Sequence, residues 1–461
     1  MTYKGNGGFE DEWDEGREED QYVPLYIPEQ YRRLEAREDK NTVRELWDRY
    51  CNADLILQPD FQRNYVWDNI KASRYVESLM LRLPTPAIFL SEETDGKWIV
   101  IDGHQRLETL FRYMQPLLSG PRKAMKNIPL PYGVLKPLRL AGLEVLSELN
   151  GSGIESLALE DREQLWETPL SIIELPKTAH FDMKYVLFAR LNQGSMSLNP
   201  QELRNCLYRG SYNQLIARLG ESSSFLSLWG RSAPDKRMKH RELVLRVFAL
   251  LHRRDKYRIP FRAFLNNEME ACRNIQQQDV ERYRQQFERA TIWVERIFGN
   301  EVFRQFQVGN EKNPTGQWGR RRYDLIYEVE MVGFAQFGDV LDKFWNTADL
   351  KEQQTLQLIM RNKLATVMTS DRFIDSINQG TTRVSAVNGR YEAWLKAMES
   401  ITQDFGNAIQ QGSLIQQALS KSSICALCPY PVSPEDAVWI SVNADRKLVH
   451  RFCQSRKENG P

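Results

Sequence analysis

The chain has 461 residues, 41% hydrophobic and 11% aromatic, which is enough apolar material for two or three globular domains. Its 62 basic and 61 acidic residues leave a net charge of +1, so any surface for nucleic acid must be local. No stretch approaches the roughly 20 apolar residues of a membrane span, and the first residues lack the apolar core of a signal peptide, so we expect a cytoplasmic protein without membrane contact.

The N-terminus carries a dense block of acidic residues. Residues 10–20 hold eight aspartates and glutamates against one basic residue, Arg17. Such a block is usually a solvated tail without fixed structure, and we predict this for residues 1–40. The alternative is that the block mimics nucleic acid and occupies a basic groove.

A first polar loop is predicted between a strand at residues 55–57 and a helix that begins at Asp68 and stops at Pro84. The apolar face of this helix is predicted to be Ala72, Val76, Leu79, Met80 and Leu83. The loop holds polar side chains that are costly to bury, namely Gln58, Asp60, Gln62 and Arg63. It is either part of a site or a surface turn with an ion pair between Asp60 and Arg63.

The second polar loop follows strands predicted at residues 87–90 and 98–101. The apolar run breaks at Asp102-Gly103 and continues with helical periodicity. A strand that turns sharply into a helix directs the free N–H groups of the helix at one point, which favours phosphate. The side chains at this point are Asp102, His104, Gln105 and Arg106. The two loops form a composite site if their strands are neighbours in one mixed sheet.

A purely structural interpretation of the same turn is also open. Asp102 is a good N-cap, and Gln105, three residues later, completes a capping-box pattern. Gly103 then serves only to permit the turn.

Two further helix starts carry capping patterns. Thr42 with Glu45 marks a helix through Tyr50, and Asn199 with Glu202 marks a helix that has Pro200 at its first position. Before the second of these, residues 183–191 are predicted to be helical and to end at Asn192.

The distribution of these elements predicts an α+β protein. A mixed sheet, whose other strong strand is at residues 169–175, occupies residues 41–210, and a mainly helical domain follows at 211–405. Within the helical domain, helices are predicted at residues 241–252 and 271–298. The basic triplet at 320–322 lies at the end of a predicted break, either as a solvated loop or as a phosphate contact.

Residues 422–461 hold paired metal-ligand residues, Cys425 with Cys428 and His450 with Cys453, separated by 21 residues. Two pairs of this kind are typical of a tetrahedral Zn²⁺ site made from two knuckles. The alternative is three reduced cysteines and a histidine near a frayed terminus.

Four ordered stretches resemble one known family. They are residues 57–67, 100–107, 188–194 and 198–205. Together they are similar to the N-terminal domain of GmrSD-type restriction proteins, which is related to the ParB-like nucleotide-binding fold. The resemblance implies a cytoplasmic protein that acts in defence against phage DNA, often modified DNA, with cleavage supplied by an HNH nuclease in the same chain or in a partner subunit.

The resemblance assigns nucleoside triphosphate binding and hydrolysis, with Mg²⁺, to the turn at Asp102–Arg106. Asp102, Gly103, Gln105 and Arg106 match the family motif, whereas His104 replaces a glutamine. Catalytic roles are therefore expected for Asp102, His104, Gln105 and Arg106. Nucleotide binding is expected for Gln58, Asp60, Gln62, Arg63, Gly103, Asn192 and Asn199.

The C-terminal module resembles an HNH nuclease in outline but has no histidine between Cys428 and His450. We therefore interpret it as a remnant stabilised by structural Zn²⁺. The sequence favours a nucleotide-dependent DNA-sensing protein. The alternatives are a non-catalytic DNA- or protein-binding adaptor and a metal-dependent endonuclease.

Overall fold

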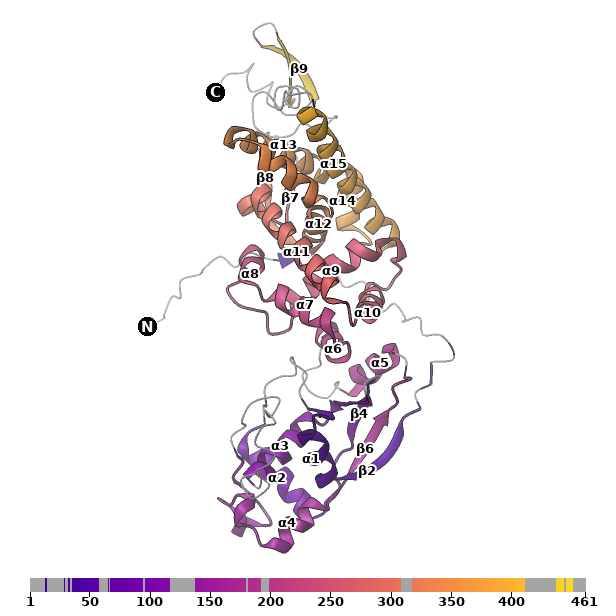
Figure 1. The fold of residues 1–461 in the computed structure, drawn as a ribbon, viewed down its shortest axis with the longest axis vertical. Helices are drawn as coiled ribbons and strands as arrows, with labels where there is room; N and C mark the ends of the chain where they lie inside the picture. The colour runs from indigo at the N-terminus through magenta and orange to yellow at the C-terminus, as the bar shows by residue number, and fades with distance from the viewer. Residues whose placement is uncertain are drawn as a thin grey trace, which may run out of the picture. The chain divides into compact units, whose positions relative to one another are not determined.

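The computed structural model describes residues 13–14, 29, 32–33, 35–57, 65, 67–93, 96–116, 137–179, 181–191, 199–307, 317–410, 437–442 and 445–450 (Figure 1). The chain divides into two compact units. One is Tyr26–Leu207, and the other is Met1–Leu25 together with Tyr208–Pro461. None of the described helices combines the length and the apolar character needed to cross a bilayer.

The first unit is built on a five-stranded mixed sheet with the order β2-β6-β4-β5-β3. The strands are β2 (Arg37–Thr42), β3 (Leu55–Ile56), β4 (Ile88–Glu92), β5 (Trp98–Asp102) and β6 (Pro169–Leu175). β6 runs antiparallel to β2 and parallel to β4, whereas β5 runs antiparallel to β4 and parallel to β3. The predicted mixed sheet, and with it the α+β class, is confirmed.

Four helices of this unit group on one side of the sheet in Figure 1, namely α1 (Val43–Cys51), α2 (Asn69–Met80), α3 (His104–Met114) and α4 (Leu159–Trp166). Their apolar faces and the sheet share one core, in which Trp47 of α1 contacts the rings of Phe111 and Trp166. The unit ends with α5 (Phe181–Leu191) and α6 (Pro200–Leu207).

Most of the local helix signals predicted for α1 and α2 are confirmed. Thr42 and Glu45 form the predicted capping box at the start of α1, and Asp68 caps α2. The predicted apolar face of α2 is wrong at Leu83. The helix ends at Met80, Arg82 adopts a φ of 53°, and Leu83 is left 51% exposed.

The second unit is mainly helical, as predicted. Its helices are α7 (Ser211–Gly220), α8 (Ser223–Trp229), α9 (Lys239–Arg253), α10 (Phe261–Ala271), α11 (Gln277–Phe298), α12 (Asp324–Thr347), α13 (Leu350–Met368), α14 (Asp371–Asn378) and α15 (Val384–Gln410). A small sheet has the order β1-β8-β7, with β1 (Trp13–Asp14), β7 (Arg304–Gln307) and β8 (Gln317–Tyr323). β9 (Ala437–Val442) and β10 (Asp445–His450) form an antiparallel hairpin.

Three predictions need correction, and the last of them also concerns the first unit. The helix expected at residues 271–298 is divided, because α10 ends at Ala271 and α11 begins only at Gln277. The basic triplet at 320–322 lies on strand β8 and not in a loop. Residues 13–14 of the predicted disordered tail form a strand with β8, and β2 already begins at Arg37.

The interior of the helical unit contains a buried ion network. Asp324 at the start of α12 is fully buried, and its Oδ2 lies 2.6 Å from Lys239 Nζ and 3.5 Å from Arg246 Nη1. Arg246 also reaches Glu242 at 2.7 Å and Glu328 at 3.1 Å. Since Arg246 is the cation that these three carboxylates share, its removal takes a partner from each of them.

Candidate functional site

The sheet brings the two predicted polar loops to one edge. β3 and β5 are parallel neighbours, with Leu55 opposite Trp98 and Ile56 opposite Ile99. The carboxyl ends of parallel neighbours lie at the same edge of a sheet, so the loop that follows β3 and the turn that follows β5 begin side by side. The condition set for a composite site is thereby met. Gln58, Asp60, Gln62 and Arg63 themselves lie outside the described residues.

The turn from β5 into α3 depends on Gly103. Its φ is +97°, in the left-handed region that favours glycine, and an added Cβ would lie 2.9 Å from Ile88 Cγ1. Gly103 is the N-cap of α3 and provides no side-chain cap. The interpretation of Asp102 as the N-cap is therefore wrong. Asp102 is the last residue of β5, and the left-handed glycine separates it from the helix.

Asp102 and Arg106 are bonded to each other across the turn. Arg106 Nη2 donates to Asp102 Oδ2 at 2.7 Å, and Nη1 donates to the backbone carbonyl of Pro86. The guanidinium is largely buried, whereas the Asp102 side chain is 38% exposed. Arg106 thus ties the turn to the segment before β4, and Asp102 is the member of the pair that solvent reaches.

His104 and Glu108 form a second pair, one helical turn apart and both buried. His104 Nε2 lies 3.0 Å from Glu108 Oε2, but neither ring nitrogen of His104 makes a hydrogen bond of good geometry. Burial lowers the pKa of His104 to about 4 and raises the pKa of Glu108 to about 7. Arg112 opposes the shift of Glu108. The imidazole is therefore neutral at pH 7.

Gln105 and Thr109 connect α3 to the end of the first loop. The backbone N–H of Trp67 donates to Gln105 Oε1 at 3.3 Å, and the Tyr65 hydroxyl lies 2.7 Å from Thr109 Oγ1. Arg112 stacks over the Tyr65 ring, with its guanidinium carbon 4.4 Å from the ring centroid. These contacts fix the residues that follow the Gln58–Arg63 segment against the helix that carries the turn.

Residues 43–209 match the family model of the GmrSD restriction endonuclease, N-terminal domain. They form a GmrSD-type N-terminal domain. Comparison with curated proteins and with solved structures gave no match. The matched range begins at α1 and ends just after α6, so it contains both loops and the turn at Gly103.

The structure describes one of the two remaining predicted residues of the GmrSD-type domain. Asn199 caps α6, where its Oδ1 accepts from the Glu202 N–H at 2.8 Å and Glu202 Oε2 accepts from the Asn199 N–H at 2.7 Å. The predicted capping box is therefore present, and this Asn199 oxygen already has a partner. Asn192 lies outside the described residues.

Two residues of the GmrSD-type domain site were missed by sequence reasoning. Glu108 and Thr109 each follow a predicted site residue by four positions, which places them on the same helix face as His104 and Gln105. This spacing was visible in the sequence. The sequence did not indicate that Glu108 is buried, because a glutamate in the middle of a helix is normally exposed.

No group of three or more metal-binding side chains occurs among the residues that the structure describes. At the turn, the Asp102 carboxylate is a hard oxygen ligand on the solvent side. Cys425, Cys428 and Cys453 lie outside the described residues, and of His450 only the backbone, at the end of β10, is described. The zinc site therefore stays a prediction.

Proposed function

We propose that the GmrSD-type domain binds a nucleoside triphosphate at the turn between β5 and α3, as part of a restriction-type protein that senses phage DNA. The restriction-type role rests on the family match of residues 43–209. The nucleotide site rests on one geometric observation: a left-handed glycine caps α3 without any side-chain cap. The start of such a helix favours anions, above all phosphate.

The residues around the turn have the chemistry that a triphosphate requires. Asp102 is the exposed carboxylate, and Mg²⁺ commonly binds proteins through one carboxylate and takes its other ligands from phosphate oxygens and water. Oδ2 of Asp102 is bonded to Arg106, so Oδ1 is the oxygen open to Mg²⁺. Bound Mg²⁺ would neutralise phosphate charge.

His104 and Glu108 are the buried pair beside this turn that suits proton transfer. The imidazole is neutral at pH 7, but burial lowers its pKa to about 4 and makes it a weak base, whereas the pKa of Glu108, 3.0 Å away, is raised to about 7. If the domain hydrolyses the nucleotide, we expect this pair to receive the proton from water. Gln105, which already holds the Trp67 backbone, is then a positioning residue.

The test is a calorimetric titration of the full chain with ATP, GTP, CTP and UTP in the presence of Mg²⁺. We expect one of them to bind and Asp102→Asn to weaken this binding at least about tenfold, through loss of a charged contact. Asp161→Asn, an exposed carboxylate on α4, is the matched control and should leave the Kd unchanged. Equal Kd values for Asp102→Asn and the unsubstituted chain would refute the site.

A non-catalytic adaptor is the second candidate, and one observation favours it. Arg106 is committed to Asp102 and Pro86, which is what a structural role of this arginine requires. Phosphate release separates the two candidates: nucleotide binding without turnover supports the adaptor, whereas release that is lost in His104→Ala supports the hydrolase. Metal-dependent nicking of plasmid DNA by the full chain would instead support the endonuclease.

The predicted structural Zn²⁺ has a test of its own. Elemental analysis of protein purified without chelators should find about one zinc per chain, and Cys425→Ser should remove it. A zinc content far below one per chain in the unsubstituted protein would refute the site.

A further inference from the structure

The turn between α9 and α10 is strongly basic. Residues 253–262 hold five arginines and lysines but a single acidic residue, Asp255. Lys256 and Arg258 are exposed, and Arg254 is partly buried. Because the whole chain has a net charge of only +1, this excess of positive charge is a local feature of the surface.

Two contacts fix this turn against the beginning of α15. The hydroxyl of Tyr257, whose side chain is buried, donates to the carbonyl of Thr382, just before the helix begins. The guanidinium carbon of Arg254 lies 5.0 Å from the centroid of the Tyr391 ring, which is also buried. The turn is therefore held in place before any ligand binds, which lowers the entropic cost of binding.

Arg383 adds a further cation beside the turn. It follows Thr382 directly, and its carbonyl accepts a hydrogen bond from the N–H of Val387 in the first turn of α15. Its side chain is exposed. The N-terminal end of this helix of 27 residues carries a partial positive charge, so the backbone adds to the charge of the neighbouring side chains.

Four of these cations have no aspartate or glutamate oxygen within 4.0 Å among the residues that the structure describes. They are Arg254, Lys256, Arg258 and Arg383, and we refer to them as the basic surface. Arg253 of the same turn, by contrast, is paired with the buried Glu268 at 2.7 Å. Unpaired arginines and lysines attract anions, and a guanidinium can bind a phosphate group through two parallel hydrogen bonds. The basic surface thus has the chemistry that a chain of phosphates requires.

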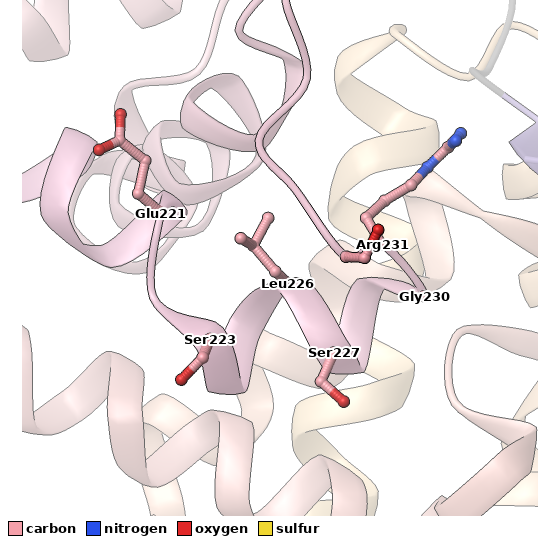
Figure 2. A pocket seen from close by; sticks show the side chains of 7 residues that line it. Glu221, Ser223, Leu226, Ser227, Gly230 and Arg231 are labelled. Carbon is pink, nitrogen blue, oxygen red and sulfur yellow. The ribbon is translucent and has the colours of Figure 1, made fainter.

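An open hollow of about 650 Å³ beside α8 offers a weaker site for an anion (Figure 2). Among the described residues that line it, Arg231 is basic and Glu221 is acidic, so these charges balance. In Figure 2 the guanidinium of Arg231 points away from the hydroxyls of Ser223 and Ser227, so these groups do not converge on one ligand. The hollow therefore provides a control position, Arg231.

We propose that the basic surface binds the phosphodiester backbone of DNA. DNA is chosen over other polyanions because of the restriction-type role proposed for the chain, on which this inference rests, but the surface involves none of the residues of the nucleotide site. Contacts to the backbone position a protein on DNA without reading its bases. We therefore expect the basic surface to bind modified and unmodified DNA equally, and the recognition of a modified base to depend on another part of the chain.

The experiment measures binding of the full chain to a fluorescent double-stranded DNA of mixed sequence by anisotropy, without nucleotide, over a range of salt concentrations. The test variant combines Lys256→Ser, Arg258→Ser and Arg383→Ser. Arg254 stays, because its contact with Tyr391 also packs the turn. We expect the Kd at low salt to rise at least about tenfold, and the slope of log K against log salt to become shallower by about 3, one for each lost phosphate contact. An unchanged Kd and slope, or an unsubstituted chain that does not bind DNA, would overturn the proposal.

Two control variants separate the loss of these phosphate contacts from other effects. Arg231→Ser with Arg282→Ser and Arg372→Ser removes the same charge from exposed arginines elsewhere in the unit and should keep the slope within about 1 of the unsubstituted value. Arg258→Lys with Arg383→Lys keeps both charges and should also keep the slope. Equal losses in the first control would overturn the location of the surface, and a lost slope in the second would overturn the role of charge.

The identity of the nucleic acid is tested by competition. Unlabelled double-stranded DNA should displace the fluorescent DNA at a lower concentration than single-stranded RNA of the same length, because a duplex carries more charge per unit length. The reverse order would assign the surface to RNA and overturn the proposal. Because no nucleotide is present, and the basic surface lies outside residues 43–209, failure of the nucleotide site leaves these results unaffected.

Discussion

The carboxylate of Asp102 accepts a hydrogen bond from the guanidinium of Arg106 at 2.7 Å, across a glycine that starts the helix between them. The pair thus holds together the end of β5 and the first turn of α3. The same arginine donates to the Pro86 carbonyl, so three segments meet at one side chain. The proposed ligand site and the stability of the turn depend on the same two residues.

We predict that Arg106→Ala lowers the free energy of unfolding by about 2–3 kcal/mol, since it removes a largely buried side chain and leaves the Pro86 carbonyl and a half-exposed carboxylate without their donor. Urea denaturation followed by circular dichroism measures this change. Arg74→Ala is the control: its pair with Glu144 is exposed on both sides and should contribute less than about 1 kcal/mol. Equal losses in the two variants would contradict a special role for Arg106.

Gly103 and Gly96 form a matched pair for testing the shape of the turn. Both have positive φ, +97° and +79°, but an added Cβ meets Ile88 at 2.9 Å only at Gly103. Gly96→Ala should cost about 1 kcal/mol, through backbone strain alone. Gly103→Ala should cost about 1–3 kcal/mol more, because Ile88 must shift. It should also abolish nucleotide binding, whereas Gly96→Ala should keep it.

Denaturation and calorimetry on the two alanine variants check both parts of this prediction. If nucleotide binding survived in a folded Gly103→Ala protein, the helix start would not be the phosphate site.

The pair of His104 and Glu108 predicts an unusual dependence of stability on pH. The pKa of His104 is lowered on folding to about 4, so this residue makes the protein more stable as pH rises from about 4 to 6.5. The pKa of Glu108 is raised on folding to about 7. The stability that this residue contributes is therefore fully present below about pH 4.5 and is lost as pH rises through 7. In the unsubstituted chain the two trends oppose each other between pH 4.5 and 6.5.

Each single substitution should expose the other trend. His104→Gln should leave stability falling between about pH 4.5 and 7, and Glu108→Gln should leave it rising between about pH 4 and 6.5. Each trend should amount to about 3 kcal/mol, since each pKa shifts by about two and a half units. Denaturation midpoints at several pH values measure both. An imidazolium signal for His104 at pH 7 in the NMR spectrum would instead show a charged ion pair and contradict the prediction.

The parts of this fold that depend on local sequence could be predicted. Thr42 with Glu45 and Asn199 with Glu202 form capping boxes because all partners lie within one turn. The strand at 169–175 has the bounds that its β-branched, apolar composition indicates. The motif at residues 100–107 pointed to the family of the N-terminal domain, and the match at residues 43–209 agrees with this.

Long-range pairing could not be predicted in the same way. The sequences of β3 and β5 do not indicate that these strands are neighbours. The pairing of Trp13 with Arg322 joins residues about three hundred positions apart. At the turn, the sequence matches a capping box, with Asp102 as the cap and Gln105 three residues later. In the structure the N-cap is Gly103, one residue further along. Only the geometry separates these two starts of α3.

The buried network around Arg246 gives the last prediction. Arg246 Nη1 lies within 3.5 Å of both Asp324 and Glu328, and these carboxylates are buried almost completely. Arg246→Ala should lower the free energy of unfolding by about 3–5 kcal/mol, because charges taken out of water lose their partner. Arg372→Ala, which breaks an exposed pair with Glu392, should cost less than about 1 kcal/mol. Urea denaturation of both variants measures the difference. The loss in Arg246→Ala should shrink when Asp324→Asn is added, since an uncharged amide needs the arginine less. A loss that is the same with and without Asp324→Asn would show that Arg246 stabilises the unit by packing and not by charge.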